Sequence, residues 1–357
     1  MVEEVKRMNS LLSNEIYKQD IQRVAVIPLE WERLQDSVFL ISGATGMVGS
    51  FLIDVLLFGK PELNIKVIAL ARNEERAKER FAYYLKAEQN HLRILTADVN
   101  VKIPVVDENV DYVIHAASQT HPRAYAAKPI QTLMTNVVGT DYMLRYALIH
   151  NMKRFMFLSS VEIYGENRGD VEKFGENYCG YLDCNTLRAG YPEGKRAGEA
   201  LCQAYIHEKG IDIVIPRLSR VYGPSMLLSD TKAISQFIKN GMCGEDIVLK
   251  SEGKQLYSYC YVADAVSGLL YCLLRGKSGE AYNISGEEIM LARLADMIAE
   301  YVGTKVVFDI PDDTERSGYS TATKAVLDTG KLRMIGWEPQ FAIHEGLAHT
   351  IDVLRRP

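Results

Sequence analysis

The sequence predicts an α/β protein built on a Rossmann-type, doubly wound parallel sheet, with a smaller α/β substrate lobe towards the C-terminus. The first observation is a glycine-rich turn within Val38–Phe58, where a short apolar strand changes into an apolar helix. The second is the alternation of short apolar strands with helical segments from there to Ile215. The third is that small or polar residues directly follow these strands, and in such sheets ligands bind beyond the carboxyl ends of the strands.

Composition and charge narrow the class of protein. The chain has 357 residues, 47% hydrophobic content and a net charge of −5, which argues against nucleic acid or an anionic membrane as the main partner. The N-terminus lacks the apolar core of a secretory signal, and three glycines and Asp54 interrupt the most apolar run, so no membrane span is expected. The six cysteines have neither a CxxC pair nor metal-ligand spacing with histidine. We therefore expect reduced core thiols, no metal and a cytoplasmic location.

Three regions divide the chain. Residues 1–36 precede the first strand, show rough helical spacing of apolar residues and are expected to form an N-terminal arm without chemistry of its own. Residues 37–224 form the predicted dinucleotide-binding domain, to which segments at about 255–285 return. Residues 225–357 are expected to form mainly the substrate-binding lobe. Because the sequence has no internal repeat and no low-complexity linker, we expect this lobe to be built from return segments of the chain.

The glycine-rich turn is the predicted anchor of a dinucleotide cofactor. Its glycines allow a sharp turn and let a pyrophosphate approach main-chain N–H groups, and the following helix adds a partial positive charge. The order strand, turn, helix is the context that this motif requires. The alternative is a tight turn that merely needs small residues. The predicted cofactor contacts of the turn are Gly43, Thr45, Gly46, Met47, Val48 and Gly49.

The end of the second strand, Ile65–Leu70, bears on the choice between NAD and NADP. Dinucleotide folds often carry an acidic residue here, which binds the adenosine ribose. This chain instead has Ala71 followed by Arg72 and Asn73, and a cation suits a 2′-phosphate. We therefore predict NAD(P), with NADP mildly favoured, unless Arg72 stacks on the adenine or lies in solvent.

The third and fourth strands end in further candidate contacts. These are Asp98, Val99, His115, Ala116, Ala117 and Ser118. Asp98 is placed to meet the adenine, although it could equally cap a turn. Two alanines at a strand end permit close approach of a ligand, whereas His115 is interpreted as a packed histidine rather than a base. The helix predicted over Thr132–Leu148 adds Asn136 as a further cofactor contact.

The fifth strand, Phe155–Leu158, delivers Ser160 and Glu162 to the same edge of the sheet. A later helix carries Tyr191 and Lys195, whose spacing puts them on one helical face. A phenol with a pKa of about 10 is a poor base, but a neighbouring ammonium and a cationic nicotinamide would favour the phenolate. Ser160 would hold the reacting oxygen of the substrate near the phenol.

Taken together, these residues resemble the extended short-chain dehydrogenase/reductases that act on nucleotide sugars, the epimerase/dehydratase family. The resemblance covers about residues 37–350. The matching pieces are Gly43-x-x-Gly46-x-x-Gly49, Asp98-Val99, His115-Ala116-Ala117, Asn136-Val137-Val138-Gly139-Thr140, Ser159-Ser160, Tyr164-Gly165, Tyr191-x-x-x-Lys195, Tyr222-Gly223-Pro224, Tyr261-Val262 with Asp264, Tyr282-Asn283 and Gly336-Trp337-x-Pro339.

The resemblance implies a mechanism and an assembly. Tyr191 would take the proton of the sugar 4-hydroxyl while hydride passes from C4 to the nicotinamide, and Lys195 would hold the nicotinamide ribose and lower the pKa of the tyrosine. Hydride returns after the 4-keto sugar has reacted, and NAD is the cofactor expected from many relatives. Arg217 is a further predicted cofactor contact. Helices at about 132–148 and 191–208 would pair in a homodimer through a four-helix bundle.

The resemblance fails at the residues that would choose the product. The 4,6-dehydratases carry an aspartate, the acid that expels water, where this chain has Val161. UDP-glucuronate decarboxylases look closest around Arg188–Lys195, yet they typically use serine where this chain has Val161 and arginine where it has Tyr257. Simple 4-epimerases need only the serine or threonine, the tyrosine and the lysine, and all are present here.

Three more residues are candidates for substrate contacts. Glu162 could abstract a proton at C5 of the 4-keto intermediate, or it could only hydrogen-bond a sugar hydroxyl. Arg220 replaces an asparagine usual in the family and could pair with a carboxylate or phosphate. Arg316 lies where relatives often place a diphosphate-binding arginine. Either arginine could instead form a surface ion pair.

We therefore expect an NAD(P)-dependent enzyme that remodels a nucleoside-diphosphate sugar through a transient 4-keto intermediate, with epimerisation as the leading outcome. Decarboxylation of a uronic acid is the first alternative, and dehydration or net reduction follows. A non-catalytic dinucleotide-binding sensor is the alternative from another class, against which the intact serine, tyrosine and lysine argue. The catalytic residues expected are Ser160, Glu162, Tyr191 and Lys195. The substrate-binding residues expected are Ser118, Val161, Arg220, Tyr257 and Arg316.

Overall fold

The computed structural model describes residues 11–86, 90–101, 103–120, 127–227, 229–310 and 323–355, so Arg316 lies outside the described residues. The helices are α2 (Glu15–Ala25), α3 (Met47–Asp54), α4 (Glu74–Arg80), α5 (Ala82–Lys86), α7 (Pro129–Ile149), α8 (Gly190–Lys209), α9 (Ala233–Met242), α10 (Val262–Arg275), α11 (Leu291–Val302), α12 (Gly330–Arg333) and α13 (Ile343–Arg355). Short turns of helix are η1 (Leu11–Ser13), η2 (Trp31–Leu34), η3 (Val55–Gly59), η4 (Pro61–Leu63), η5 (Val161–Tyr164) and η6 (Leu187–Ala189).

The strands form one large parallel sheet and two small ones. The large sheet contains β1 (Val38–Ser42), β2 (Lys66–Ala71), β3 (Leu92–Thr96), β4 (Tyr112–His115), β5 (Arg154–Phe157), β6 (Ser159–Ser160), β7 (Ile213–Leu218) and β11 (Ala281–Ile284). The small sheets contain β8 (Arg220–Tyr222), β9 (Ile247–Leu249), β10 (Leu256–Tyr261), β12 (Glu288–Met290), β13 (Val306–Phe308) and β14 (Lys324–Ala325).

The large sheet has the order β11-β7-β5-β4-β1-β2-β3, with β6 beside β7, and every pairing in it is parallel. The chain winds outwards from β1 first to β2 and β3 and then, on the other side, to β4 and β5. Ligands of such sheets bind at the point where the strand order reverses, here between β1 and β4. The predicted Rossmann-type, doubly wound sheet is confirmed.

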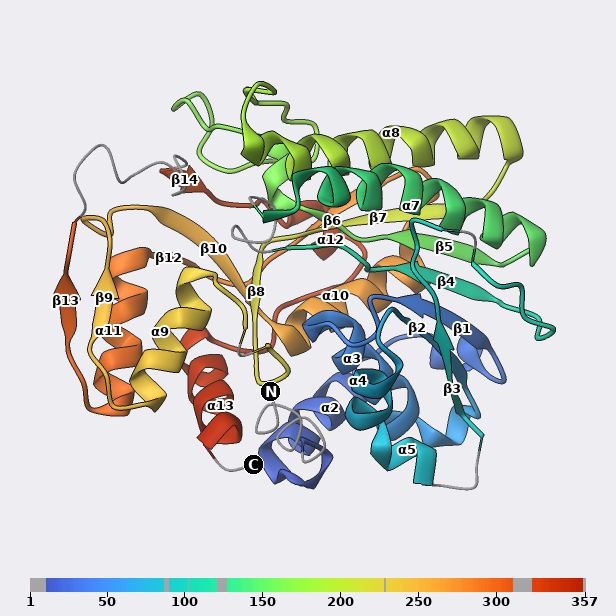
Figure 1. Ribbon diagram of the computed structural model, residues 1–357, viewed down its shortest axis with the longest axis horizontal. Coiled ribbons are helices and arrows are strands. Elements are labelled where there is room, and N and C mark those ends of the chain that lie inside the picture. Colours follow the sequence, from blue (N-terminus) through green and yellow to red (C-terminus); the bar gives the residue numbers. More distant parts are fainter. Residues whose placement is uncertain are drawn as a thin grey trace.

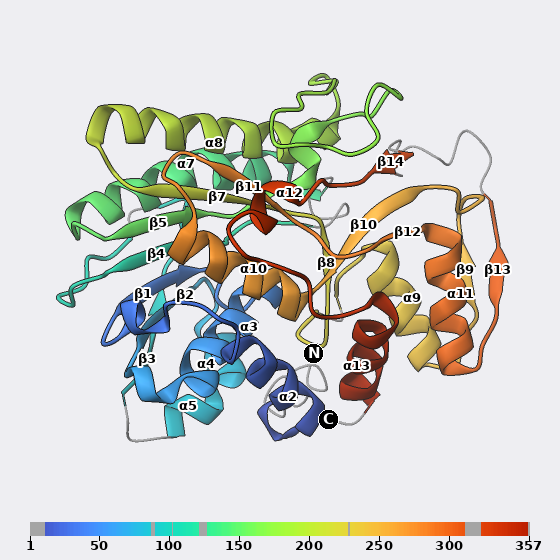
Figure 2. The same cartoon turned by 180° about the vertical axis from the view of Figure 1, so that it is seen from behind.

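Two apolar cores lie on opposite faces of the large sheet. Because successive strand residues point to opposite faces, Phe39 and Ile41 belong to the core that includes Phe51 of α3, whereas Leu40 belongs to the core that includes Met143 of α7 and Cys202 of α8. Figures 1 and 2 show α7 and α8 on one face of the sheet and α3 and α10 on the other. The continuous apolar run of β1 thus supplies side chains to both cores.

The smaller lobe is organised around β10. This strand pairs in parallel with β8 and β14 and antiparallel with β12, while β9 and β13 form a separate pair. Helices α9, α11 and α13 lie around these strands at one end of the molecule (Figure 1). The chain then returns to the large sheet, because β11 pairs with β7. The break between β7 and β8 therefore moves Arg220 out of the large sheet, although only Ser219 separates it from Leu218.

Two predicted helices differ from the sequence pattern. The helix after the glycine turn keeps α-helical geometry only to Asp54 and continues as one π turn, η3. The charged stretch after β2, whose composition favours one continuous helix, is divided into α4 and α5 at Phe81, which is fully buried and leaves helical geometry at φ −107° and ψ 18°. Burial of this ring explains the interruption, because tertiary packing overrides the helical propensity of the charged residues around it.

The N-terminal arm is tied down by buried polar contacts. The Tyr17 hydroxyl on α2 donates to the Asp54 carboxylate at 2.6 Å, and the fully buried Arg80 guanidinium pairs with the same carboxylate. Nearly one helical turn further along α2, the buried Asp20 accepts from the Tyr261 hydroxyl and contacts Nδ1 of His349 at 2.8 Å. Buried charges need such partners, so α2 joins α3, β10 and α13.

Several expected absences can be examined in the described part of the chain. None of its helices is long and apolar enough to cross a membrane. It holds no group of three or more His, Cys, Asp or Glu residues placed to bind a metal ion. All six cysteines are free, but Cys179, Cys184 and Cys243 are exposed, so the expectation that most are core thiols is wrong for half of them.

Candidate active site

The glycine turn lies between β1 and α3 and needs its glycines for close backbone packing. Gly43 has φ +68°, and a Cβ on it would lie 2.7 Å from the carbonyl carbon of Ala116. A Cβ on Gly49 would lie 2.5 Å from the Gly43 carbonyl oxygen. Gly46 caps α3 without a side-chain hydrogen bond, so Met47 and Val48 begin the helix with N–H groups that no capping side chain occupies.

Side chains at the ends of β2 and β3 mostly make local contacts. Ala71 is buried and Arg72 is exposed, while the Asn73 side chain caps α4 by accepting from the backbone N–H of Arg76 at 2.9 Å. Asp98 accepts from the backbone and side chain of Asn100, both at 2.9 Å. Asp98 therefore does close a turn. Its predicted contact with the adenine stays a prediction, as does the contact of Arg72 with a 2′-phosphate.

His115 at the end of β4 is a packed, neutral histidine. Its Nδ1 lies 2.8 Å from the Ser42 hydroxyl, and that hydroxyl accepts from the Ala117 backbone N–H at 3.3 Å. Burial lowers the pKa of His115 to about 3, and the Lys195 charge acts in the same direction. An imidazole of this kind is a poor proton acceptor at neutral pH, in agreement with the interpretation from the sequence.

Asn136 on α7 holds together the pieces around it. It accepts from the Ser118 hydroxyl at 3.0 Å and donates to the Thr132 carbonyl at 2.9 Å. A Cβ on Gly194 of α8 would lie 3.0 Å from the Asn136 Cβ, so the two helices nearly touch here. In the same way, a Cβ on Gly139 would lie 3.0 Å from Val99. Both Ser118 and Asn136 are thus engaged by the protein itself.

The predicted serine and tyrosine do come together. Ser160 ends β6, its hydroxyl accepts from the Glu162 backbone N–H at 3.3 Å, and it also forms a side-chain hydrogen bond with Tyr191 of α8. Burial raises the pKa of Tyr191 strongly, the Ser160 bond opposes this rise, and the Glu162 charge adds to it. The protein by itself therefore favours the neutral phenol.

Lys195 lies on α8 one turn after Tyr191 but is directed at the sheet. Its Nζ donates to the Leu158 carbonyl at 2.7 Å and lies 4.7 Å from the centre of the Phe157 ring. Burial lowers the pKa of Lys195 to about 7, although the charges of Glu199 and Cys202 favour the ammonium. Burial is the largest influence on the pKa of both groups in the protein alone, and the expected lowering of the Tyr191 pKa by Lys195 stays a prediction.

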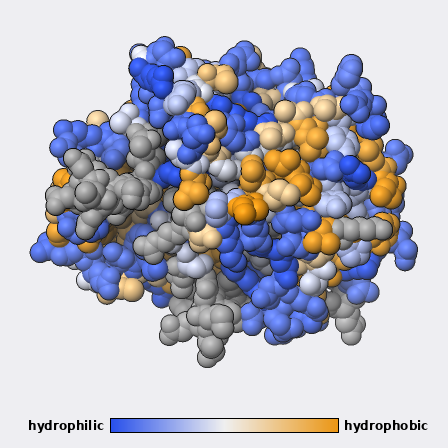
Figure 3. Space-filling model, turned by 45° about the horizontal axis from the view of Figure 1, so that its top comes forward, coloured by the Kyte–Doolittle hydropathy of each residue, from blue (hydrophilic) through white to orange (hydrophobic). Residues whose placement is uncertain are grey.

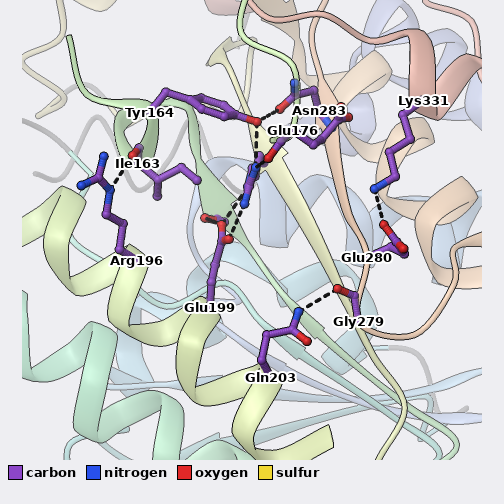
Figure 4. Close-up of polar contacts among 12 residues, drawn as sticks. Ile163, Tyr164, Glu176, Arg196, Glu199, Gln203, Gly279, Glu280, Asn283 and Lys331 are labelled. Atoms are coloured by element: carbon purple, nitrogen blue, oxygen red, sulfur yellow. Dashed lines mark hydrogen bonds and ion pairs between the residues drawn. The ribbon is translucent and has the colours of Figure 1, made fainter. Parts of the chain in front are cut away.

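A buried acidic side chain, Glu199, stands behind this pair. Figure 4 shows Glu199 pointing from α8 towards Tyr164 and Asn283. Its Oε1 accepts from the Ser159 hydroxyl at 2.5 Å and from Nε of Arg217 at 3.0 Å, and its Oε2 accepts from Nη2 of Arg217 at 2.6 Å. Nη1 of Arg217 in turn donates to the Tyr164 hydroxyl at 2.9 Å. The Tyr164 hydroxyl itself donates to the Asn283 side chain at 2.6 Å.

Arg217 is therefore a structural connector between β7, α8 and the loop after η5. With a further bond to the Glu176 carbonyl at 2.6 Å, four of the five donors of its guanidinium serve the protein. The cofactor contact expected of Arg217 stays a prediction, for which a single N–H remains. The sequence did contain a signal for Glu199, because it follows Lys195 by four residues and so shares the helical face of Tyr191.

The residues expected to choose the product gather on the other side of Ser160. Val161 is buried at the start of η5, and the neighbouring Glu162 carboxylate lies 3.8 Å from Nη2 of Arg220. The Arg220 guanidinium lies over the Tyr257 ring, 3.7 Å from its centre. Residues from η5, β8 and β10 thus meet, although about ninety-five positions separate the first from the last in the sequence.

A comparison with known protein families identifies the family to which the chain belongs. The family is described as "NAD dependent epimerase/dehydratase family", and its profile matches residues 39–285. The chain belongs to the NAD dependent epimerase/dehydratase family. The resemblance to extended short-chain dehydrogenase/reductases of nucleotide sugars is thereby confirmed.

Curated relatives of this epimerase/dehydratase family member carry one recurring name. UDP-glucuronic acid decarboxylase 5 of Arabidopsis thaliana is 33% identical over 314 residues, which cover 86% of each chain. UDP-glucuronic acid decarboxylase 1 of Xenopus tropicalis is 30% identical over 322 residues, or 89% of this chain and 72% of the relative.

Solved structures agree on the fold. The dTDP-glucose 4,6-dehydratase DesIV of Streptomyces venezuelae, with NAD and TYD bound, is 25% identical at a TM-score of 0.75, with 89% of this chain and 97% of that chain covered. A UDP-glucuronic acid 4-epimerase of Bacillus cereus, in complex with UDP-glucuronic acid and NAD, has a TM-score of 0.75 at 20% identity, with 89% and 99% covered. At such identity the second likeness concerns the fold alone.

Proposed function

We propose that this family member oxidises UDP-glucuronic acid at C4 and releases C6 as carbon dioxide. The proposal is carried by the Ser160–Tyr191 hydrogen bond beside Lys195 at the carboxyl end of β6. It is supported by relatives up to 33% identical that are named UDP-glucuronic acid decarboxylases. Decarboxylation therefore takes the place of epimerisation, which the sequence alone favoured, as the leading outcome.

The residues around the glycine turn and Lys195 would suit a bound NAD(P). The uncapped start of α3 offers N–H groups to a pyrophosphate, and the glycine turn keeps side chains away from it. Lys195 has three N–H donors, of which the Leu158 carbonyl takes one, and we assign another to the nicotinamide ribose. When bound, the nicotinamide accepts the hydride from C4 and later returns it. Arg72 is exposed at the end of β2, where it suits a 2′-phosphate.

Tyr191 and Ser160 handle the proton of the 4-hydroxyl. The hydrogen bond between them brings two oxygens to one point, so a sugar hydroxyl bound there can be held by the serine while the phenol accepts its proton. The phenol must be ionised for this step, and burial opposes ionisation. Lys195 follows Tyr191 by one helical turn, and we assign to its ammonium the role of favouring the phenolate once the cofactor is bound.

Oxidation at C4 turns the C6 carboxylate into part of a β-keto acid. The C5–C6 bond can then break, carbon dioxide leaves, and its electron pair remains as the enolate of the 4-ketone. This enolate takes up a proton at C5 before hydride returns to C4. We assign the proton transfer at C5 to Glu162, which takes up a proton from solvent and passes it to C5, because its backbone N–H binds Ser160 and its charge reaches Tyr191.

The second candidate is 4-epimerisation of the same sugar. Val161 and Tyr257 favour it, because they replace the serine and the arginine that the resemblance associates with decarboxylases. In that case the 4-keto sugar rotates within the site and receives the hydride on its opposite face, and the carboxylate is retained. The two candidates share their substrate, their cofactor and the roles of Ser160 and Tyr191.

Mass spectrometry of the product separates the two candidates. The protein is incubated with NAD and UDP-glucuronic acid. A UDP-pentose that has lost carbon dioxide supports decarboxylation, whereas a product of unchanged mass with a new retention time supports epimerisation. Tyr191→Phe should slow either reaction about 100- to 10,000-fold. Full turnover by that variant would refute the proposed base, and binding of NAD without conversion of any sugar nucleotide would favour a sensor.

We also propose that two copies associate through α7 and α8. Ile130 is 79% exposed on α7, with Leu133 and Met134 partly exposed on the same helix and Leu187 exposed just before α8. Figure 3 shows apolar side chains gathered on the face that carries these helices. Apolar patches on a surface mark interaction sites, and burying them in a helix bundle would give the homodimer expected from the resemblance.

A further inference from the structure

Arg220 is held rigidly on the substrate side of the site. It begins β8, which pairs in parallel with β10 so that Arg220 lies opposite Tyr259. Its guanidinium stacks on the ring of Tyr257, two residues earlier in β10, with 3.7 Å between Cζ and the ring centre. The side chain is only 18% exposed. A guanidinium is weakly hydrated and planar, so an aromatic face stabilises it in one orientation.

One end of this guanidinium is left without a hydrogen-bond partner in the described part of the chain. Nη1 of Arg220 is buried and has no hydrogen-bond partner among the residues that the structure describes. Nη2 lies 3.8 Å from Oε1 of Glu162, which is an ion-pair distance but too long for a hydrogen bond. Buried donors are nearly always satisfied, and leaving one unpaired is costly. An arginine of this kind fits a planar anion that can accept two parallel bonds.

The position of Arg220 tells which anion of the substrate can reach it. Its partner Glu162 donates its backbone N–H to Ser160, and the Glu162 charge acts on Tyr191. Arg220 therefore lies beside the groups that handle the C4 hydroxyl. In a uronic acid the carboxylate is attached to C5, directly next to C4, whereas the diphosphate is attached to C1 across the ring. The C6 carboxylate therefore fits the position of Arg220 better than the diphosphate does.

We propose that Arg220 anchors the C6 carboxylate of the sugar, and that this carboxylate replaces Glu162 as the partner of the guanidinium. This inference rests on the proposed function, because it assumes a uronic acid as substrate. Glu162 is then free of its ion pair in the complex and can act at C5. Arg220 thereby becomes the residue that selects nucleotide sugars with a carboxylate over those without one, with Tyr257 as its platform.

Binding measurements on the NAD-loaded protein test the anchor. UDP-glucuronic acid, UDP-xylose and UDP are titrated by calorimetry, since UDP-xylose has the same ring without the carboxylate and UDP lacks the sugar. Arg220→Met keeps an apolar stem over Tyr257 but removes the charge. We expect this variant to weaken UDP-glucuronic acid about 10- to 100-fold and to change UDP-xylose and UDP less than about threefold.

A second arginine on a tyrosine offers a matched control. Arg168 lies 4.3 Å from the centre of the Tyr181 ring and 3.5 Å from Glu166, but it is well exposed. Arg168→Met should leave all three affinities unchanged. Glu162→Gln should keep or improve the affinity for UDP-glucuronic acid while it lowers turnover, because the competing partner of Arg220 is gone but the C5 group is lost.

The outcomes separate the anchor from the proposed function. Equal losses for all three ligands in Arg220→Met would assign the arginine to the diphosphate or to folding and overturn the inference. Weaker binding of UDP-glucuronic acid by Glu162→Gln would overturn the exchange of partners. If the wild type prefers UDP-glucuronic acid over UDP-xylose through Arg220 but converts neither, the anchor stands and the proposed reaction fails. If the wild type shows no preference, the anchor fails whatever the reaction.

Discussion

Arg217 and Glu199 form a two-bond ion pair between β7 and α8, with Nη2–Oε2 at 2.6 Å and Nε–Oε1 at 3.0 Å. Both side chains are almost buried, at 11% and 13% exposed. The Glu199 carboxylate also accepts a hydrogen bond from the hydroxyl of Ser159, the neighbour of Ser160. Glu199 lies one helical turn beyond Lys195 on α8. The pair therefore fixes the strand end that carries Ser160 against the helix that carries Tyr191 and Lys195.

Removing one member of this pair should destabilise the protein strongly. Glu199→Ala leaves a buried guanidinium uncompensated, and we expect a loss of about 3–5 kcal/mol of unfolding free energy. The exposed pair Arg333–Glu338, at 2.7 Å, is the control, and Glu338→Ala should cost less than about 1 kcal/mol. Urea unfolding followed by circular dichroism measures both. Similar costs for the two variants would show that burial adds nothing to the Arg217 pair.

The glycine turn can be tested against a glycine with the same backbone conformation. Gly43 and Gly210 have φ +68° and +67°, but a Cβ at Gly43 would meet Ala116 whereas one at Gly210 meets nothing within 4 Å. Gly210→Ala should cost about 1 kcal/mol through the backbone alone. Gly43→Ala should cost clearly more and also weaken NAD binding at least about 10-fold, because the turn must move. Thermal melts and NAD titrations would contradict this prediction if both variants behaved alike.

His115 should make the protein sensitive to acid. Its pKa is lowered to about 3 in the folded protein because it is buried, whereas an unfolded histidine takes up a proton below about 6.5. Unfolding therefore binds a proton between these values, and stability falls by up to about 1.4 kcal/mol per pH unit as the pH drops through this window. Urea unfolding at pH 7 to 4 compares the wild type with two variants.

His115→Phe should flatten the acid limb of that stability curve. His207→Gln, at an exposed site on α8, should leave the limb as it is in the wild type. The relevant quantity is the difference in unfolding free energy between wild type and variant, because other groups, such as Asp264, titrate in the same range. A constant difference between wild type and His115→Phe from pH 7 to 4 would refute the prediction.

Arg72 should decide any preference for NADP. It is exposed at the end of β2, and the preceding Ala71 offers no carboxylate to a ribose hydroxyl. Arg72→Ala is expected to weaken NADP about 10-fold and NAD less than about threefold, as for a single charge-assisted hydrogen bond. Fluorescence titration with both cofactors measures the ratio. A parallel loss for both would instead place the side chain on the shared adenine.

The association of two copies can be tested on α7. Ile130→Asp places a charge on the most exposed apolar side chain of that helix and should turn a dimer into a monomer. Met334→Asp, at an equally exposed apolar residue far along the chain, serves as the control. Light scattering coupled to size-exclusion chromatography gives the mass. A wild-type protein that is already monomeric at micromolar concentration would refute the proposed dimer.

Patterns within short stretches of the sequence were enough to predict the scaffold and the placement of Tyr191 and Lys195 on one helix. The continuous apolar run of Phe39, Leu40 and Ile41 and the glycine spacing after it depend on neighbours in the chain, so local rules predict β1 and its turn. The spacing of Tyr191 and Lys195 depends only on helix geometry. The apolar pattern of a strand and the spacing of residues on a helix are properties of a single segment. The predictions of β1, its turn and the Tyr191–Lys195 helix therefore needed no knowledge of how the chain packs.

Tertiary structure decided which partners these groups have. The sequence could not show that Arg217 is bound by Glu199, that Lys195 turns to the Leu158 carbonyl, or that Arg220 stacks on Tyr257. Each of these contacts joins different elements and depends on how the sheets and helices pack. Burial follows from the same packing, so the raised pKa of Tyr191 and the unpaired donor of Arg220 became visible only when the surrounding residues were in place.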